Sequence, residues 1–486
     1  MSVPRSILVL LALAAGCAAP RSAHDEIAAA RRVAAAAQAV PQDSMRTTAS
    51  EGAGALPRLD GPLSLADAIE VGLTNNLSLH AARLRRAEAD GAYDEALGEA
   101  LPGLNATAGW TADLVDRSRD VQPDRQSVGL SLTQPIYRSG VVGKGIEYAR
   151  YYRESVDLAI RDAEQATIFQ IASLYLNVLY EQRMVEVYEG ALGTAERLKA
   201  TTESRRRAGT ASQYEVLRAE VERTSANAAL ISERNRLRTA RVTLLKTLGV
   251  DQSSQVELTD DLVYVAEVFD ADAMIAQALE FRPDLAQAEA NVRMADLMLG
   301  IAHGRYGLSI DAFASATYAT PNPNDPSDDD WDFDASAGLT ATLPLYDGTT
   351  RRGRIAQARS KLEQARVALH SAEEDARVAV ITAVLDLDDA DELYLSQRTN
   401  LATAEEAKRM IESGYRQGRN TQVEVLDAQS ALTRAQGAYY SAIRAHSLAG
   451  LGVRRATGTL VPADAARYVA AAQADDAPTA ANPPTP

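Results

Sequence analysis

Residues 213–217 read Gln-Tyr-Glu-Val-Leu, and residues 422–426 read Gln-Val-Glu-Val-Leu. The second stretch lies 209 positions after the first, and the same offset aligns residues 135–249 with residues 344–458 without a gap. Identical residues across this span include Pro135 and Pro344, Tyr137 and Tyr346, Glu164 and Glu373, Arg207 and Arg416, Gly209 and Gly418, and Gly249 and Gly458. A constant offset over such a span indicates an internal repeat, so we predict that the chain is a duplication of one unit.

Proline-free tracts in each half predict very long helices. Residues 136–282 and 345–461 contain no proline, the residue that breaks a helix interior. Apolar residues in these tracts recur at threes and fours, as in the predicted seam of Val425, Ala428, Leu432, Ala435 and Tyr439. A single helix over residues 138–207 would span about 105 Å at ~1.5 Å per residue, the scale of a crossing of the periplasm. Gly209 and Gly418 then mark tight turns between antiparallel helices, because glycine readily adopts the left-handed conformation.

Ahead of each long helix the periodicity changes from helical to alternating. Apolar residues alternate with small polar ones over residues 127–133 and again over residues 333–343, and weaker alternation occurs near residues 104–115 and 308–319. A membrane strand requires this pattern, because one face meets lipid and the other meets water. Trp110, Tyr318, Trp331 and Phe333 stand where such strands carry interfacial aromatics. Hairpins of a soluble protein are the alternative interpretation.

Four strands in one chain cannot close a barrel. An open sheet edge in lipid leaves backbone groups unpaired, at a cost of several kcal/mol each, so closure would require several copies of the chain. This argument alone allows 8, 12 or 16 strands. No stretch after the N-terminal leader approaches the roughly 20 apolar residues that a spanning helix needs, so we expect any membrane-spanning part to be β.

The N-terminus predicts a secreted lipoprotein. Residues 1–16 carry one basic residue and an apolar run, as a signal peptide does. Ala14-Ala15-Gly16-Cys17 then resembles a lipobox, which marks Cys17 for lipidation, although position 14 is more often leucine; ordinary cleavage near Ala19 is the alternative. Cys17 is the single cysteine, so no intrachain disulfide can form.

Composition narrows the function further. The net charge of −16 argues against nucleic acid as a partner and suits a water-filled path for cations, although acidity also aids solubility. The five histidines are scattered, with no pair at metal-ligand spacing, so we predict neither a metal nor a cofactor. No nucleophile or catalytic base is arranged for chemistry, so the chain is not expected to be an enzyme.

The order of these elements resembles the TolC-type outer-membrane efflux protein family over about residues 63–458. The motif that carries the resemblance best is Gly414-Tyr415-Arg416-Gln417-Gly418 followed by Glu424-Val425-Leu426-Asp427-Ala428; Asn75-Asn76 and Arg282-Pro283-Asp284-Leu285 also fit. The resemblance implies a homotrimer in which the four strands of each chain contribute to a 12-stranded β-barrel in the outer membrane. Long antiparallel helices would form an α-barrel below it. The expected fold class is therefore mainly α with a membrane β-barrel.

The resemblance also implies site residues. Glu424 and Asp427 match acidic positions that form rings facing the lumen at a periplasmic gate, and Tyr415 matches a tyrosine of the gate network. Glu215 is the counterpart of Glu424 in the first repeat. The hairpin tips at Gly209 and Gly418 would be the place where an adaptor docks. Asn420 stands where the family has an arginine, which leaves the bonds of the closed gate open. Crowded carboxylates at the gate are expected to raise one another's pKa values.

We therefore expect an exit duct in the outer membrane, serving a tripartite efflux or type I secretion system. Its partners would be a periplasmic adaptor and an inner-membrane pump, and its cargo is not specified by the sequence. A periplasmic coiled-coil adaptor lipoprotein is the alternative, although such adaptors generally carry one hairpin where this chain has two. The predicted division is a signal peptide (1–16), a lipidated extended segment (17–62), two repeats (63–250 and 271–458) and a disordered C-terminal tail (459–486).

Overall fold

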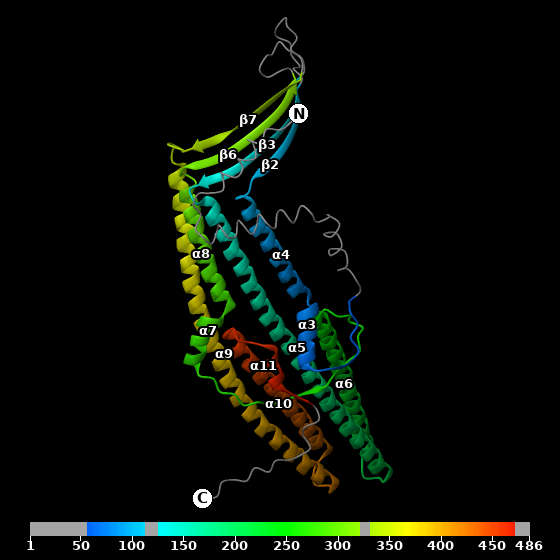
Figure 1. Cartoon of the computed structure of the whole chain (residues 1–486). Coiled ribbons are helices and arrows are strands. Elements are labelled where there is room, and N and C mark those ends of the chain that lie inside the picture. Colours follow the sequence, from blue (N-terminus) through cyan, green and yellow to red (C-terminus); the bar gives the residue numbers. More distant parts are fainter. Residues whose placement is uncertain (1–55, 112–124, 321–330, 472–486) are drawn as a thin grey trace. The chain divides into compact units, whose positions relative to one another are not determined.

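A computed structural model describes residues 56–111, 125–320 and 331–471, and these residues are mostly helical (Figure 1). The first half of the chain contains α3 (Leu65–Asn75), α4 (Leu77–Gly98), β2 (Gly103–Thr111), β3 (Arg125–Arg138), α5 (Val141–Arg207) and α6 (Gln213–Leu248). The second half contains α7 (Ala271–Phe281), α8 (Pro283–Gly304), β6 (Ser309–Thr320), β7 (Asp332–Thr342), α9 (Thr350–Arg416) and α10 (Gln422–Ala456). Helices at corresponding positions in the two halves match in length: α5 and α9 both have 67 residues, and α4 and α8 both have 22.

The turn from strand to long helix comes three residues later than the sequence predicts. We expected a helix from residue 138, but β3 continues to Arg138 through a bulge between Pro135 and Tyr137, where a proline can be accommodated. Ser139 and Gly140 then take positive φ angles of 48° and 76°, and α5 starts at Val141. The Ser139 hydroxyl donates to the Leu308 carbonyl at 2.8 Å, which holds this turn against the start of β6.

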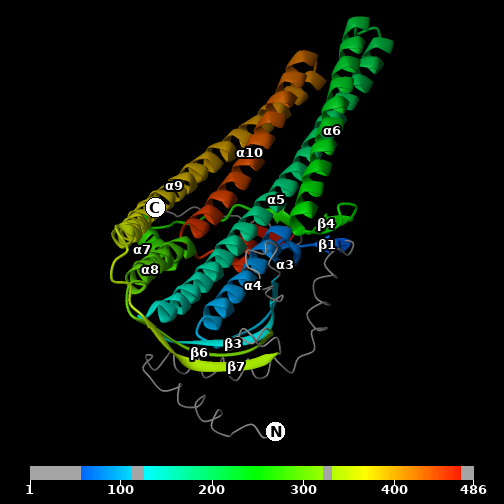
Figure 2. The ribbon, with the colours of Figure 1, turned by 90° about the horizontal axis from the view of Figure 1, so that it is seen from above.

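The described residues form two compact units. One holds residues 84–111, 125–157, 287–320 and 331–370, and the other holds residues 56–83, 158–286 and 371–471. In the second unit α5 pairs with α6 and α9 pairs with α10 as helical hairpins, which both views show (Figures 1 and 2). In the part of the chain that the structure describes, no helix is both long enough and apolar enough to cross a membrane.

The first unit contains a curved antiparallel sheet in the order β2-β3-β6-β7 (Figure 1). Its register separates the side chains cleanly. One face is apolar except at strand ends; its members include Leu104, Ala106, Val128, Leu130, Leu132, Ala314, Ala316, Tyr318, Phe333, Ala335 and Leu339. The other face is mostly small and polar, with Asn105, Thr107, Ser127, Ser131, Thr133, Ser315, Thr317, Asp334 and Ser336. The alternation predicted for the strands is confirmed, and β3 pairs with β6 to join the two halves of the chain in one sheet.

The second unit is built on a core around the middle of α5. Ile171, Tyr175 and Leu176 are fully buried there, against residues of α3, α6 and α10. The Tyr175 hydroxyl donates to the Leu63 carbonyl at 2.9 Å and lies 2.9 Å from the Asp260 carboxylate. Gly72 of α3 approaches Ile171 so closely that an added Cβ would lie 2.1 Å from its side chain. The core therefore depends on one small residue in α3 as well as on the apolar stripe of α5.

In each half, a side chain at the end of a short helix donates a hydrogen bond to a backbone carbonyl at the end of a long helix. The two halves use different side chains for this contact. Asn76, at the C-cap of α3, donates from Nδ2 to the Thr247 carbonyl near the end of α6 at 2.7 Å. Arg282, at the C-cap of α7, donates from Nη1 to the Ala456 carbonyl at the end of α10 at 2.9 Å. Both contacts satisfy a helix-terminal carbonyl that has no partner within its own helix.

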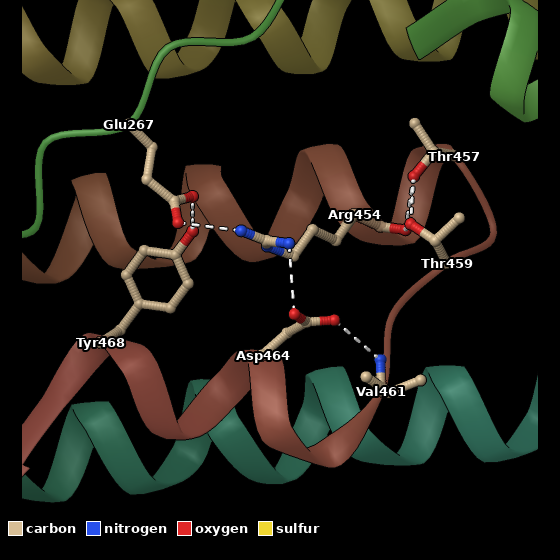
Figure 3. Close-up of polar contacts among 7 residues, drawn as sticks. All are labelled: Glu267, Arg454, Thr457, Thr459, Val461, Asp464 and Tyr468. Carbon is tan, nitrogen blue, oxygen red and sulfur yellow. Dashed lines mark hydrogen bonds and ion pairs between the residues drawn. The ribbon is translucent and has the colours of Figure 1, made fainter.

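The C-terminal segment differs from the disordered tail predicted from residue 459. Residues 462–471 form α11 (Pro462–Ala465), a short 3₁₀ helix (Ala466–Tyr468) and β8 (Val469–Ala471), which pairs with β5 (Asp260–Leu262). Tyr468 is fully buried and its hydroxyl donates to the Glu267 carboxylate at 2.5 Å; Arg454 of α10 pairs with Glu267 at 2.8 Å and with Asp464 at 3.2 Å (Figure 3). We call these four residues the C-terminal clasp. The alanine-rich composition predicts disorder, but composition does not reveal contacts with residues that are distant in the sequence. These contacts hold the segment in place.

Candidate functional site

The two long hairpins turn with the same backbone geometry. Gly209 and Gly418 take φ angles of +78° and +74°. The amide of Gly209 donates to the Arg206 carbonyl and the amide of Thr210 to the Arg205 carbonyl, and the second hairpin repeats this pair of bonds from Gly418 and Arg419. This is the Schellman arrangement, in which a left-handed glycine lets the last helical carbonyls find donors. The predicted turn glycines are therefore confirmed as helix-terminating residues.

After each turn, the next helix starts with a capping box. In the first tip the Ser212 amide donates to the Glu215 carboxylate at 2.6 Å, and the Glu215 amide donates to the Ser212 hydroxyl at 3.2 Å. In the second tip Thr421 and Glu424 exchange the same bonds at 2.6 and 3.3 Å. Both helix starts thereby satisfy two backbone donors that would otherwise lack partners. Two of the expected gate carboxylates thus have a local role in starting a helix.

Glu424 makes one more contact within its tip. The Asn420 amide donates to the Glu424 carboxylate at 3.1 Å. Asn420 lies so close to Gly414 that a Cβ there would come 1.8 Å from the Asn420 side-chain oxygen. The Thr421 backbone N–H, followed by the Asn420 amide, lowers the pKa of Glu424, and the Ser212 backbone N–H lowers the pKa of Glu215. Within one chain, donors around the ionised carboxylate lower the pKa of Glu424. The rise expected from carboxylates of neighbouring subunits at the gate stays a prediction.

The two tips contact each other through one residue from outside the motifs, Arg205, and two from within them, Tyr415 and Gln422. The Arg205 guanidinium lies 5.4 Å from the centre of the Tyr415 ring, a cation–π contact from the end of α5 to the end of α9. The buried Gln422 amide donates to the Glu215 carbonyl at 3.5 Å, which links the starts of α10 and α6. Gln422 was visible in the sequence as part of the repeated Gln-x-Glu-Val-Leu stretch, whereas Arg205 carried no signal.

The expected gate residues Tyr415, Glu424 and Asp427 lie at the tip of the α9–α10 hairpin, but they differ in exposure. Tyr415 is half-buried beside Arg205, whereas Glu424 and Asp427 are exposed. These two carboxylates stand three residues apart at the start of α10 and so share a helix face. The buried seam on the same helix includes Val425, Leu432 and Ala435, so the acidic pair lies off the seam. Cys17 lies outside the described residues.

The arrangement is a pair of polar, charged helical tips. Among the described residues, no group of three His, Cys, Asp or Glu side chains is placed to hold a metal ion. What the tips offer is a set of exposed carboxylates and arginines, with the exposed Tyr214 and the half-buried Tyr415, at the ends of long helices. Such a surface can attract ions and form salt-sensitive contacts with other helices.

The chain matches one family over both halves. The model of the family described as "Outer membrane efflux protein" matches residues 68–250 and 274–459. Among curated relatives, the outer membrane efflux protein BepC of Brucella suis is 24% identical over 335 residues, covering 69% of this chain and 72% of the relative. The outer membrane protein OprJ of Pseudomonas aeruginosa is 26% identical over 418 residues, covering 80% of this chain and 83% of the relative.

Solved structures share the fold. The outer membrane protein VceC of Vibrio cholerae aligns with a TM-score of 0.67 at 19% identity, over 81% of this chain and 96% of that one. The CmeC outer membrane channel of Campylobacter jejuni aligns with a TM-score of 0.69 at 14% identity, over 81% of this chain and 85% of that one. At these identities the likeness concerns the fold.

Proposed function

Because the chain belongs to the outer membrane efflux protein family, we propose that it is the passive exit duct of a tripartite efflux or type I secretion system. In this role it receives cargo from an inner-membrane pump through a periplasmic adaptor that docks at the hairpin tips, around Gly209 and Gly418. Cargo would leave through a pore formed by three copies of the chain. The family places the protein in the outer membrane and assigns it transport without catalysis.

The sheet supports this proposal most directly. Its two faces differ in chemistry, and in the described residues the outer strands β2 and β7 each pair on one side only. An apolar face and a polar face suit lipid and water respectively. Open edges in lipid are costly, and closure between copies removes them. Three copies would supply 12 strands, the count expected from the family resemblance. The periplasmic adaptor alternative is not supported by the family match, and it offers no use for such a sheet.

A matched pair of substitutions tests which face meets lipid. Leu130 lies on the apolar face near the middle of β3, and Ser131 beside it lies on the polar face. An arginine facing the hydrocarbon core costs about 2–4 kcal/mol near the midplane of a barrel, whereas one facing the lumen does not. Leu130→Arg should therefore strongly reduce detergent-stable trimers measured by native mass spectrometry, and Ser131→Arg should assemble normally. Equal assembly of both variants, or a wild-type protein that stays monomeric or needs no detergent, would contradict the proposal.

Lipidation of Cys17 remains part of the proposed function. It rests on the lipobox-like stretch before the only cysteine of the chain. Mass spectrometry of the mature N-terminus should show a diacylglyceryl-modified residue 17. Cys17→Ser should leave trimers intact, because the strands would supply most of the membrane attachment. A mature chain that starts elsewhere without lipid rules this step out.

A further inference from the structure

One aromatic side chain stands on the polar face of the sheet. Phe313 pairs with Thr133 of β3 on one side and with Gly338 of β7 on the other. Its neighbours along β6 on that face are Asp311 and Ser315. Every other aromatic side chain in the described strands of this sheet lies in the register of the apolar face. Phe313 is therefore an apolar exception on a surface of small polar groups.

The position of the ring is set by a glycine. A Cβ at Gly338 would lie 3.0 and 3.1 Å from two ring carbons of Phe313, so the ring rests where another residue would have a side chain. Packing of an aromatic over a cross-strand glycine is a known means of stabilising a strand pair. Phe313 is nevertheless 38% exposed. The glycine thus holds the ring close to the sheet while leaving part of its surface open on the polar side.

The first half of the chain contains a strand pair that corresponds to Phe313 and Gly338 but has no aromatic ring. Gly129 is the counterpart of Gly338 at the 209-residue offset, and it is paired with Thr107 of β2. A Cβ at Gly129 would lie 3.1 Å from the Thr107 hydroxyl oxygen. In the same sheet, a threonine therefore covers the glycine that corresponds to Gly338. Because threonine suffices there, strand pairing does not require phenylalanine at position 313.

We propose that Phe313 is a specificity-determining residue that contacts cargo carrying aromatic rings. The inference rests on the proposed function, in which the polar face of the sheet lines the water-filled pore. Three subunits would then place three aromatic rings on an otherwise polar wall. A ring held in this way offers stacking to planar aromatic groups and a cation–π contact to aromatic cations. Cargo without rings gains little from the same wall.

Photo-labelling of the full-length protein in lipid nanodiscs tests the contact. The probe is ethidium azide, a planar aromatic cation, and labelled peptides are mapped by mass spectrometry. Wild-type protein should be labelled in β6 around residue 313, with competition by ethidium and none by tetraethylammonium. Phe313→Thr, which copies the Thr107 arrangement, should lower this labelling by roughly two- to tenfold, the range expected from one aromatic contact. Thr107→Phe should add labelling in β2.

The controls separate the inference from its premise. Phe313→Leu keeps an apolar side chain over Gly338 without a π face, so it should lose labelling as Phe313→Thr does. Equal labelling around residue 313 in all variants, or none in wild-type trimers, overturns the inference and leaves the duct intact. Failure of the wild-type protein to form trimers overturns the proposed function, and the inference falls with it. Melting temperatures of all variants, measured in the same nanodiscs, report any purely structural effect of the ring.

Discussion

At the scale of single residues, the two hairpin tips combine a structural and a functional requirement in the same side chains. Glu424 caps the start of α10 and is also the residue expected to present charge at the gate. Alanine at this position would remove both properties at once. Glutamine removes only the charge, because a glutamine side chain can also complete a capping box. The difference decides how the gate should be tested.

We predict that Glu424→Gln combined with Asp427→Asn weakens the cation preference of the trimer and abolishes block by a trivalent cation complex. Up to six carboxylates would converge at the narrow end of the pore, and carboxylate rings attract cations. Planar-bilayer recordings measure both effects. Glu363→Gln, which removes one exposed carboxylate from the part of α9 far from the tips, should leave both unchanged. Unaltered selectivity and block in the double variant would mean that these carboxylates face away from the pore.

A second prediction concerns the backbone of the tip. Gly418→Ala should destabilise the turn by about 1–2 kcal/mol, the cost of a left-handed conformation for a residue with a Cβ. No atom lies within 4 Å of the added Cβ, so the effect comes from the backbone alone. Gly353 also has open space but is helical, and Gly353→Ala should stabilise by about 0.5–1 kcal/mol. Amide hydrogen exchange at each site measures the change in local stability for both variants. Changes of the same sign would refute the argument.

At the scale of helices, a pair of carboxylates connects α5 and α6. Glu233 of α6 is only 3% exposed and pairs with Arg236 at 3.0 Å, and its carboxylate acts on the carboxyl group of Glu181 in α5. Burial, then the neighbouring Glu233 carboxylate, raises the pKa of Glu181 to about 7; the Arg236 and Arg444 charges act in the opposite direction. Near neutral pH the two helices therefore hold a carboxyl group that readily gains or loses a proton.

This pair predicts a pH dependence of stability. The pKa of Glu181 is raised on folding from its ordinary 4.5 to about 7, so the folded state binds more protons between these values. Stability should therefore fall as pH rises from about 5 to 7.5, and depend little on this group below pH 4.5. Thermal melts of Glu181→Gln should lose this slope. Glu189→Gln, at an exposed ion pair on the same helix, should keep it; persistence of the slope in Glu181→Gln would refute the assignment.

At the scale of the whole molecule, the clasp and the sheet connect parts of the chain that are far apart in sequence. Tyr468 and Arg454 meet at Glu267, which lies in the connection between the two halves (Figure 3). Gly450 makes room for the tyrosine, since a Cβ there would lie 2.2 Å from its hydroxyl. The end of the described chain is thus part of the core of its unit, together with the buried Leu460 and Ala465.

Two truncations should separate the clasp from the residues after position 471. A chain that ends after Ala471 keeps every clasp residue and should retain the wild-type melting temperature. A chain that ends after Thr459 loses Tyr468 and Asp464 and leaves Glu267 and Arg454 with fewer partners, so it should melt several degrees lower. Tyr468→Phe should cost about 1–3 kcal/mol, because the partly buried Glu267 carboxylate loses a donor. Equal melting temperatures for both truncations would show that the clasp contributes nothing.

The amino-acid sequence by itself determined the features that depend on local periodicity. Long helices follow from proline-free tracts with apolar residues at threes and fours, and the strand faces follow from alternation such as that of Val128 and Leu130 with their polar neighbours. Gly209 and Gly418 marked the turns because a left-handed residue after a helix favours glycine. Each of these signals is carried by residues adjacent in the chain, so it can be read without knowing the fold.

Only the tertiary structure decided the contacts between distant residues. The Arg205–Tyr415 contact joins positions 210 residues apart, and the Tyr468–Glu267 bond joins positions 201 apart. The capping role of Glu424 left a pattern in Thr421-Gln-Val-Glu424, yet its bond to Asn420 depends on how the turn folds back. The prediction of a disordered tail was wrong for residues 462–471 for the same reason. Burial of Tyr468 requires a pocket assembled from α10 and the connecting segment, and no local pattern encodes a pocket made by other parts of the chain.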